Sequence, residues 1–405
     1  MMEVTIERLG LHGDGIAPGP VYAPRCLPGE TVEGEVVGTR LDAPRIVKPS
    51  TERVRAPCPH YKSCGGCALQ HASDDFVSRW KQEIVRAALA ARGITANPDG
   101  IETSPPRSRR RAVLSARRTK AGPFIGFHAP RSDAITRVPG CELLHPDLMK
   151  AIPALEALVE TGASRKGALR LSVTLSQAGP DVSISGGKPL DRILASDLAR
   201  IADEAGLARL TWDDETVALV AAPVQAFGNA MVTPPPGAFL QATAEGEAAL
   251  LREARRAVGP AARVLDLFAG CGTFALPLAE GSEVHAVEGD AAMLACLDAG
   301  WRGAAGLKRV TTETRDLFRR PLVAEELNRF DAIVIDPPRA GAEAQMTEIA
   351  ASNVSRVASV SCNPVTFARD SRLLLDAGYR LERLVVVDQF RWSTHVEIAA
   401  GFSRD

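Results

Sequence analysis

The chain has 405 residues, of which 45% are hydrophobic and 24% are charged, and its formal net charge is −1. Such a length exceeds one typical core, so two or three globular domains are expected. The start lacks the apolar stretch of a signal peptide and no stretch is long enough for a membrane span, which predicts a cytoplasmic protein without a membrane partner. In a reducing compartment, the eight cysteines favour metal binding or catalysis over disulfides.

Residues 1–55 alternate short apolar stretches with Gly and Pro turns, which predicts a small β-barrel of the OB type. Residues 13–17 (GDGIA) are a strong hairpin signal. Together with residues 10–12 (GLH) and 27–32 (LPGETV), this hairpin resembles a TRAM domain, which is a small RNA-binding barrel. The alternative is a structural barrel without a ligand.

Residues 56–235 predict a central α+β domain that carries a cysteine cluster. Its first 40 residues contain a C-x5-C-x2-C motif and an amphipathic helix over residues 74–92. The predicted ligands are Cys58, Cys64 and Cys67, with Cys141 as the best-placed fourth. Four thiolates hold either zinc or an iron–sulfur cluster, and the spacing alone does not decide between them. No role is predicted for Cys26, Cys271 or Cys296.

Basic residues crowd one short segment of this region, although the net charge is close to zero. They are Arg107, Arg109, Arg110, Arg111, Arg117, Arg118 and Lys120. This segment is either a stripe that contacts nucleic-acid phosphates or a solvated strand face.

Residues 236–405 form the third predicted domain, in which strands alternate with helices as in a Rossmann-like, mostly parallel α/β sheet. A buried strand over residues 264–268 turns through Gly270 and Gly272, so backbone amides can approach a ligand closely. Glu288 ends the next strand and can accept hydrogen bonds from both ribose hydroxyls. The pattern favours S-adenosylmethionine over a nicotinamide cofactor, which needs G-x-G-x-x-G after the strand.

Further residues are predicted to line this methyl-donor site. They are Gln241, Asp266, Phe268, Asp316 and Asp336. Asp316 lies where this fold places an acid near the adenine, and a strand-end cap is the alternative for it.

Cys362 follows an apolar strand over residues 357–360 and precedes Asn-Pro, so it is predicted at the carboxyl end of a strand, where open α/β sheets carry their chemistry. A lone cysteine in a strand is more often inert. Beside a methyl donor, a thiolate can add to C6 of a pyrimidine and make C5 nucleophilic, after which a base must remove the C5 proton. Arg339 is the cation predicted to lower the pKa of this thiol.

Five strings resemble the class I RNA (uracil-5) methyltransferases of the RumA/RlmD and TrmA type. They are residues 239–241 (FLQ), 265–272 (LDLFAGCG), 336–341 (DPPRAG), 361–370 (SCNPVTFARD) and 395–397 (HVE). The resemblance spans nearly the whole chain and implies that Cys362 is the nucleophile and Glu397 the proton-abstracting base. It also implies that Gln241 and Asp336 bind the uracil edge, beside Phe239 and Arg339.

The same resemblance implies a [4Fe-4S] cluster and a 23S rRNA substrate, because the tRNA branch lacks both the barrel and the cysteine motif. A tRNA substrate is the first alternative, and a non-catalytic RNA-binding assembly factor is the second. Thr243 and residues 391–393 (RWS) depart from the family pattern, which bears on the substrate loop. A monomer is expected.

Overall fold

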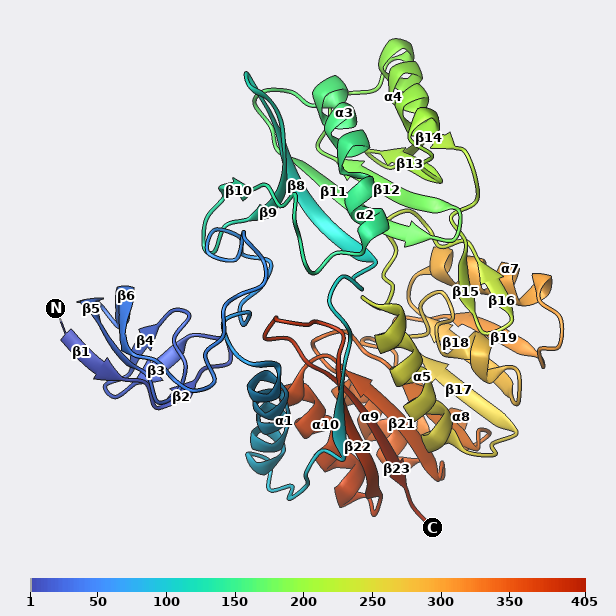
Figure 1. The fold of residues 1–405 in the computed structure, drawn as a ribbon. Coiled ribbons are helices and arrows are strands. Elements are labelled where there is room, and N and C mark those ends of the chain that lie inside the picture. The colour runs from blue at the N-terminus through green and yellow to red at the C-terminus, as the bar shows by residue number, and fades with distance from the viewer. Residues whose placement is uncertain (1) are drawn as a thin grey trace.

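The computed structural model describes residues 2–405, which form an N-terminal sheet, a central sheet with helices and a C-terminal α/β unit (Figure 1). The N-terminal sheet has the strand order β1-β5-β6-β4-β3-β2. Its strands are β1 (Met2–Thr5), β2 (Arg8–Leu9), β3 (Gly15–Ala17), β4 (Val21–Ala23), β5 (Thr31–Val37) and β6 (Arg40–Lys48). Val32 and Leu41 are fully buried between these strands, so alternate residues of each strand make one small core. A small β domain therefore begins the chain.

The central unit is a seven-stranded sheet in the order β10-β9-β8-β11-β12-β13-β14, with helices packed on one face (Figure 1). Its elements are β8 (Arg111–Thr119), β9 (Gly122–His128), β10 (Ile135–Thr136), α2 (Pro146–Lys150), α3 (Ile152–Gly162), β11 (Leu169–Ser176), β12 (Gly179–Ser185), α4 (Arg192–Glu204), β13 (Arg209–Trp212) and β14 (Glu215–Leu219). Trp212 is fully buried here, and Gly162 and Gly187 make room for it, since a Cβ at either would lie within 2.2 Å of its ring. This is the α+β architecture expected for the middle of the chain.

The C-terminal unit is an eight-stranded sheet in the order β19-β18-β17-β20-β21-β23-β22-β7. Its strands are β7 (Gly100–Thr103), β17 (Arg263–Leu267), β18 (Glu283–Glu288), β19 (Val310–Thr314), β20 (Ala332–Ile335), β21 (Arg356–Ser361), β22 (Arg380–Asp388) and β23 (Glu397–Ser403). Strands β17 to β21 run parallel, as predicted, whereas β23 runs antiparallel to both of its neighbours. The first residue of β23 therefore lies at the edge where β21 ends.

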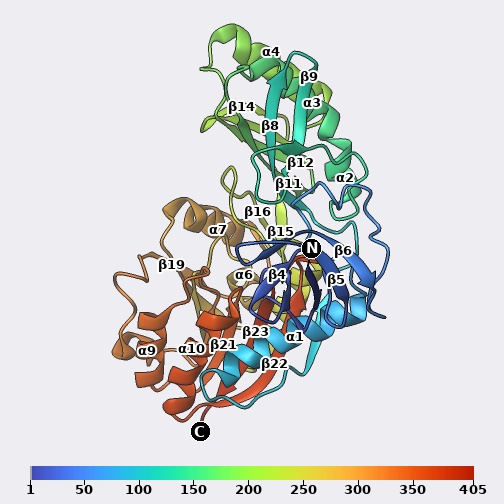
Figure 2. The same cartoon turned by 90° about the vertical axis from the view of Figure 1, so that its left-hand side faces the viewer.

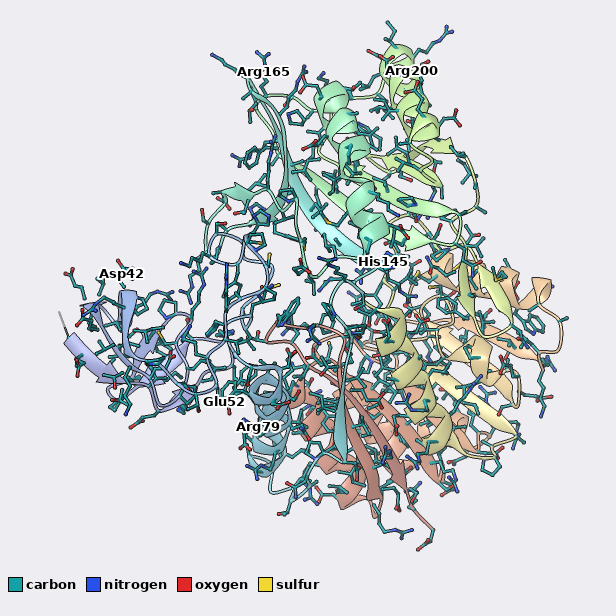
Figure 3. All side chains as sticks on the ribbon, in the orientation of Figure 1. Asp42, Glu52, Arg79, His145, Arg165 and Arg200 are labelled. Carbon is teal, nitrogen blue, oxygen red and sulfur yellow. The ribbon has the colours of Figure 1, made fainter. Side chains whose placement is uncertain are left out.

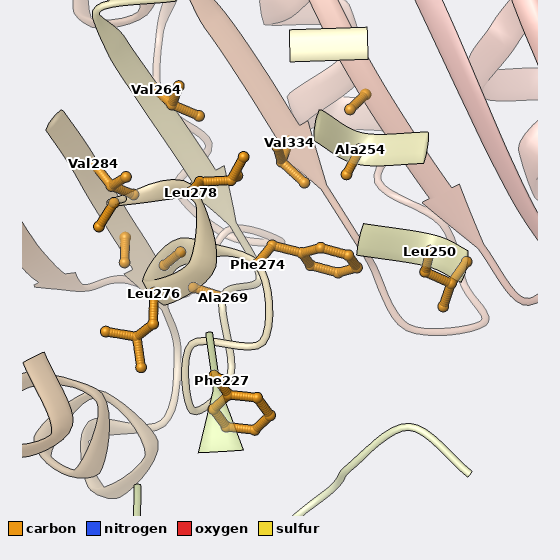
Figure 4. Packing of buried hydrophobic residues seen from close by; sticks show 14 of the residues in the cluster. Phe227, Leu250, Ala254, Val264, Ala269, Phe274, Leu276, Leu278, Val284 and Val334 are labelled. Carbon is orange, nitrogen blue, oxygen red and sulfur yellow. The ribbon is translucent and has the colours of Figure 1, made fainter. Parts of the chain in front are cut away.

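Helices cover both faces of this sheet and create two cores. The helices are α1 (Asp74–Ala90), α5 (Ala244–Val258), α6 (Ala275–Leu278), α7 (Ala291–Gly303), α8 (Ala324–Leu327), α9 (Glu343–Ala351) and α10 (Pro364–Asp376), and a hairpin of β15 (Gln225–Phe227) and β16 (Ala230–Val232) accompanies α7. On one face, Leu250 of α5 and Phe274 pack over Val334 of β20 (Figure 4). The unit is thus doubly wound, as predicted. Within residues 2–405, none of the helices is both long and apolar enough to cross a membrane.

The segment 74–103, which the sequence places in the central domain, contributes α1 and β7 to the C-terminal unit instead. Figure 2 shows α1 lying along the C-terminal unit, and β7 pairs in parallel with β22. The reason is the apolar stripe of α1, whose Val85 and Leu89 are fully buried in the core shared with α10. Amphipathicity predicted the helix, but it does not specify which surface the helix covers.

A buried ion pair fixes α1 to the end of β22. The Lys81 Nζ atom donates to Asp388 Oδ1 at 2.6 Å and to the Phe390 carbonyl at 3.1 Å. Burial lowers the pKa of Lys81 and raises that of Asp388, so desolvation opposes the pair. Such a pair adds little net stability but costs about 3–5 kcal/mol to break. It therefore determines where α1 and the loop after β22 lie.

Candidate active site

The loop after β17 has the backbone conformation of a close ligand contact. Gly270 and Gly272 have φ angles of 55° and 96°, which glycine adopts without strain. Phe268 has a φ angle of 61°, which is uncommon for an aromatic residue and marks a strained site. Helix α6 behind the loop has only four residues, so its dipole is small. The Gly270 and Gly272 N–H groups already donate within the protein, to Glu288 and to the Ala269 carbonyl.

Glu288 ends β18, as predicted, and joins this loop to the strand edge. Its Oε2 atom accepts from the Gly270 N–H at 3.0 Å, and its Oε1 atom accepts from the Gly289 and Asp290 N–H groups at 2.7 and 3.1 Å. The carboxylate is thereby held in one orientation and still has acceptor capacity for hydroxyl groups. The fixed orientation and the remaining acceptor capacity of Glu288 both suit hydrogen bonds from the hydroxyl groups of a ribose.

Asp266 lies on β17 with no solvent exposure, and neither carboxylate oxygen has a hydrogen-bond partner among residues 2–405. Burial, followed by the charge of Asp336, raises its pKa well above 3.8, although the nearby Ala275 N–H opposes this shift without reaching hydrogen-bond geometry. An unpaired buried carboxylate needs a cation. The ammonium and sulfonium groups of S-adenosylmethionine satisfy that need, and the bound cofactor would supply the electrophilic methyl group.

Asp316 follows β19 and caps a turn, since its Oδ1 atom accepts from the Phe318 N–H at 3.0 Å and the Arg319 N–H at 3.3 Å. This is the capping role given as the alternative, and its contact with a cofactor stays a prediction. Phe318, which sequence reasoning missed, is 51% exposed, and its ring centroid lies 5.4 Å from that of Phe268. The two rings offer a flat adenine an aromatic surface.

Side chains from three strand ends meet beside the donor loop. Asp336 follows β20, Cys362 follows β21 and Glu397 begins β23. The Gln241 Nε2 atom donates to Asp336 Oδ2 at 3.2 Å, so the two residues predicted to bind the uracil edge lie side by side. Gln389, which sequence reasoning missed, links Gln241 to Glu397. These five residues are the candidate catalytic group.

Burial shifts every acid of this group toward its protonated form. It raises the pKa of Asp336 to about 7 and, together with the charge of Asp336, that of Glu397 to about 8. Desolvation, Glu397 and Asp336 also raise the pKa of Cys362 to about 11, and Arg339 lowers it by less. In the protein alone the shift is therefore opposite to the expected direction, because burial and two carboxyl groups outweigh one guanidinium.

The Cys362 thiol lies on the wall of a groove of about 800 Å³. The N-terminal sheet contributes Leu9 and Leu11 to this groove, α1 contributes Trp80, and the C-terminal unit contributes Arg339. The ion pair of Arg79 and Glu52 stands where the N-terminal sheet meets α1 (Figure 3). An open, mostly apolar groove with cationic side chains suits unstacked bases joined by phosphates.

The predicted basic stripe is divided. Three of its arginines form ion pairs: Arg107 with Glu142, Arg110 with Glu247 and Arg118 with Glu160. The Arg109 guanidinium instead lies 5.6 Å from the ring centroid of Phe390, and that of Arg111 lies 4.6 Å from that of Phe239, which is 56% exposed. Glutamates distant in sequence therefore offset part of the charge of this stripe, and its contact with phosphates stays a prediction. The part that faces the candidate site is aromatic as well as basic.

The four predicted metal-binding cysteines lie near one another. Burial raises the pKa of Cys67 to about 12, and Cys141, Cys64 and Cys58 each raise it further. Cys141 and Cys58 likewise raise the pKa of Cys64, after burial. In the part of the chain that the structure describes, however, no three His, Cys, Asp or Glu side chains are arranged to hold a metal ion. Four cysteine thiols are suitable ligands for a metal centre, but in the described part of the chain they are not arranged around one metal position.

The doubly wound sheet, the glycine turn after β17 and the acidic end of β18 define a methyltransferase of the S-adenosylmethionine-dependent class. A family model described as tRNA (Uracil-5-)-methyltransferase matches residues 302–404. An uncharacterised RNA methyltransferase of Mesorhizobium japonicum is 45% identical over 98% of this chain and 96% of its own length. The 23S rRNA (uracil(1939)-C(5))-methyltransferase RlmD of Vibrio parahaemolyticus is 32% identical over 99% and 95%.

A solved structure adds likeness of fold. The Pyrococcus abyssi tRNA (uracil-54, C5)-methyltransferase, in complex with S-adenosyl-L-homocysteine, matches with a TM-score of 0.76 at 22% identity, covering 99% of each chain. The protein belongs to the RNA (uracil-5) methyltransferase family. This confirms the resemblance drawn from the five strings.

Asp266→Asn tests the donor site. We expect S-adenosyl-L-homocysteine to bind about tenfold to hundredfold more weakly, because a charged hydrogen bond is lost. The ligand-free variant should be more stable than the wild type above about pH 4. The pKa of Asp266 is higher in the folded protein than in the unfolded protein, so the wild type loses stability as the pH rises above the unfolded-state pKa of this residue. Calorimetry and thermal unfolding at several pH values check both effects.

The matched control is Asp331→Asn, since Asp331 accepts from the Ala262 and Arg263 N–H groups at the opposite end of β17. This variant should keep wild-type affinity for the ligand. Equal losses in both variants would contradict the role assigned to Asp266.

Proposed function

We propose that this protein uses S-adenosylmethionine to methylate C5 of a specific uridine in ribosomal RNA, with Cys362 as nucleophile and Glu397 as base. The observation that carries the proposal is the meeting of Cys362 with Glu397 at one sheet edge, beside the Gln241–Asp336 pair and the donor loop. The antiparallel direction of β23 supports it, because only that direction brings the start of this strand to the end of β21.

The chemistry follows from these residues. Asp336 accepts the N3–H of uracil and Gln241 donates to a carbonyl. The Cys362 thiolate forms a bond to C6, and the electron pair of the C5–C6 double bond moves toward O4. C5 then takes the methyl group, for which S-adenosyl-L-homocysteine would be the leaving group, Glu397 removes the C5 proton, and the C6–S bond breaks so that the thiolate leaves. A base with a pKa of about 8 is well matched to this proton transfer near neutral pH.

The choice of RNA rests on other features. The Vibrio parahaemolyticus relative named as a 23S rRNA methyltransferase aligns with nearly the whole chain, and the cysteine-rich segment that the family resemblance links to the ribosomal branch is present. The β domain does not separate the two substrates, because the Pyrococcus abyssi tRNA methyltransferase also matches 99% of the chain. The description of the family model favours tRNA as the alternative. In either RNA the uridine must leave its stack, at a cost of a few kcal/mol that contacts in the groove beside Trp80 can offset.

An iron–sulfur cluster at Cys58, Cys64, Cys67 and Cys141 is a separate part of the proposal, with zinc as the alternative. The gathering of four thiols supports it. Elemental analysis of protein purified without oxygen should find iron with acid-labile sulfide, and both should be lost in Cys64→Ser but retained in Cys26→Ser, which changes a cysteine of the N-terminal core. Zinc without sulfide, or no metal, would contradict the cluster.

Deletion of the gene tests the target. Nucleoside mass spectrometry of the deletion strain should show the loss of one 5-methyluridine from 23S rRNA and none from tRNA. The wild-type gene should restore the modification, and Cys362→Ala should not. A loss confined to tRNA would favour the alternative substrate, and full restoration by Cys362→Ala would overturn the covalent mechanism.

Glu397→Gln should stall after methyl transfer, because an amide cannot remove the C5 proton. We expect turnover on RNA from the deletion strain to fall about 10²- to 10⁴-fold, with a denaturation-resistant protein–RNA adduct accumulating. Denaturing gels and methyl incorporation measure the two effects. Rapid and complete turnover by this variant would refute Glu397 as the base.

A further inference from the structure

Gln389 is a buried amide in the loop after β22, and neither the family strings nor the proposed mechanism assigns it a task. Its side chain is 1% exposed. The Oε1 atom accepts from the Ala242 N–H at 2.7 Å. The Nε2 atom donates to Gln241 Oε1 at 2.6 Å and to Glu397 Oε2 at 3.1 Å. Gln389 therefore touches both the proposed base and the residue that pairs with Asp336.

The direction of this hydrogen-bond chain is fixed by chemistry. A backbone N–H can only donate, so the Gln389 atom that faces Ala242 must be the carbonyl oxygen. The other end of that amide is an NH2 group, which can only donate, so Gln241 must turn its own oxygen toward Gln389. Gln241 is then left with its NH2 group facing Asp336, as the 3.2 Å contact requires.

We propose that Gln389 is a positioning residue, which orients the Gln241 amide as a donor toward the pyrimidine and holds the Glu397 carboxylate in place to take the C5 proton. The inference rests on the proposed function. One N–H of Gln241 donates to Asp336, and the other faces the pyrimidine ring of the substrate. A donor at this position matches a uracil carbonyl and opposes the exocyclic amine of cytosine.

The hold on Glu397 has a second consequence. The hydrogen bond from Gln389 favours the ionised carboxylate, against burial and the charge of Asp336. The titratable and charged groups around Glu397 are Asp336 after β20, Cys362 after β21, and Arg339 and His395 on the wall of the same groove. The charge of Glu397 in turn raises the pKa of the Cys362 thiol, so the reactivity of this thiol reports on the ionisation of Glu397.

Gln389→Met is the informative variant, because methionine fills a similar volume without a donor or an acceptor. Gln345→Met is the matched control. Gln345 is also 1% exposed, and its amide likewise bridges two main-chain groups, the Leu322 N–H at 2.8 Å and the Leu322 carbonyl at 3.0 Å, away from the candidate site. Gln389→Glu is a second variant that keeps the acceptor for Ala242 and loses the donor.

The first readout needs no RNA. Cys362 is alkylated with iodoacetamide across a pH series, and its peptide is quantified by mass spectrometry. In Gln389→Met, Glu397 should ionise at a higher pH, so Cys362 should react about threefold faster near pH 8, the change that half a pKa unit gives. Gln345→Met should follow the wild-type profile.

The second readout is methylation of RNA from the deletion strain. For Gln389→Met and Gln389→Glu, we expect kcat to fall about tenfold to hundredfold with a smaller change in KM, and adduct to accumulate because proton removal is slowed. The pair Gln389→Met and Gln241→Met should be non-additive, since one residue acts through the other. Gln345→Met should lose stability without losing kcat.

The outcomes separate the two proposals. If Cys362→Ala retains full turnover, the proposed mechanism fails, while the alkylation profile still shows whether Gln389 controls Glu397. If Cys362→Ala is inactive but Gln389→Met matches Gln345→Met in both readouts, the role of Gln389 is refuted and the mechanism stands.

Discussion

Removal of carboxyl groups from water at one edge of the C-terminal sheet is the constraint on which the site depends. Asp266, Asp336 and Glu397 lie at or near neighbouring strand ends, and burial raises the pKa of each. Such groups are costly to ionise unless a partner arrives. Within residues 2–405, these carboxyl groups are met by amides or by no partner rather than by a cation, and a cationic methyl donor and a hydrogen-bonding pyrimidine are the ligands that satisfy them.

The same constraint explains the state of the nucleophile. Burial, and after it two acidic neighbours, raise the pKa of Cys362 and favour the thiol in the ligand-free protein, despite Arg339. A thiol has little reactivity toward stray electrophiles, since the thiolate is the nucleophilic form. Binding of a cation beside Asp336 and Asp266 would offset the negative charge that opposes thiolate formation.

The fold determines which groups meet. Because β23 runs against β21, the residue that begins β23 lies beside the residue that follows β21, although they are 35 positions apart. Lys81 of α1 fixes Asp388, and the next residue, Gln389, reaches across to Gln241 and Glu397. The loop after β22 is therefore fixed by two contacts, one from Lys81 of α1 and one from the side-chain amide of Gln389. Both contacts restrict the geometry of the base.

The sequence predicted what is encoded in contiguous strings. Cys362, Glu397, Glu288 and the glycine turn all follow from a strand pattern and the residues just beyond it. The role of Gln389 could not be predicted, because its partner Gln241 lies 148 positions away in the chain and is brought near only by the fold. Likewise, the stripe of α1 did not reveal that the helix packs beside α10, and the neutralised arginines and the raised pKa of Cys362 depend on acids brought near only by the fold.

Infrared spectroscopy of the ligand-free protein tests the burial of these acids most directly. Near pH 7, the spectrum should contain a band from protonated carboxyl groups, which weakens in Asp336→Asn and in Glu397→Gln and decreases as the pH rises past about 8. A spectrum that neither substitution changes, with both groups ionised at pH 7, would contradict this account of the site.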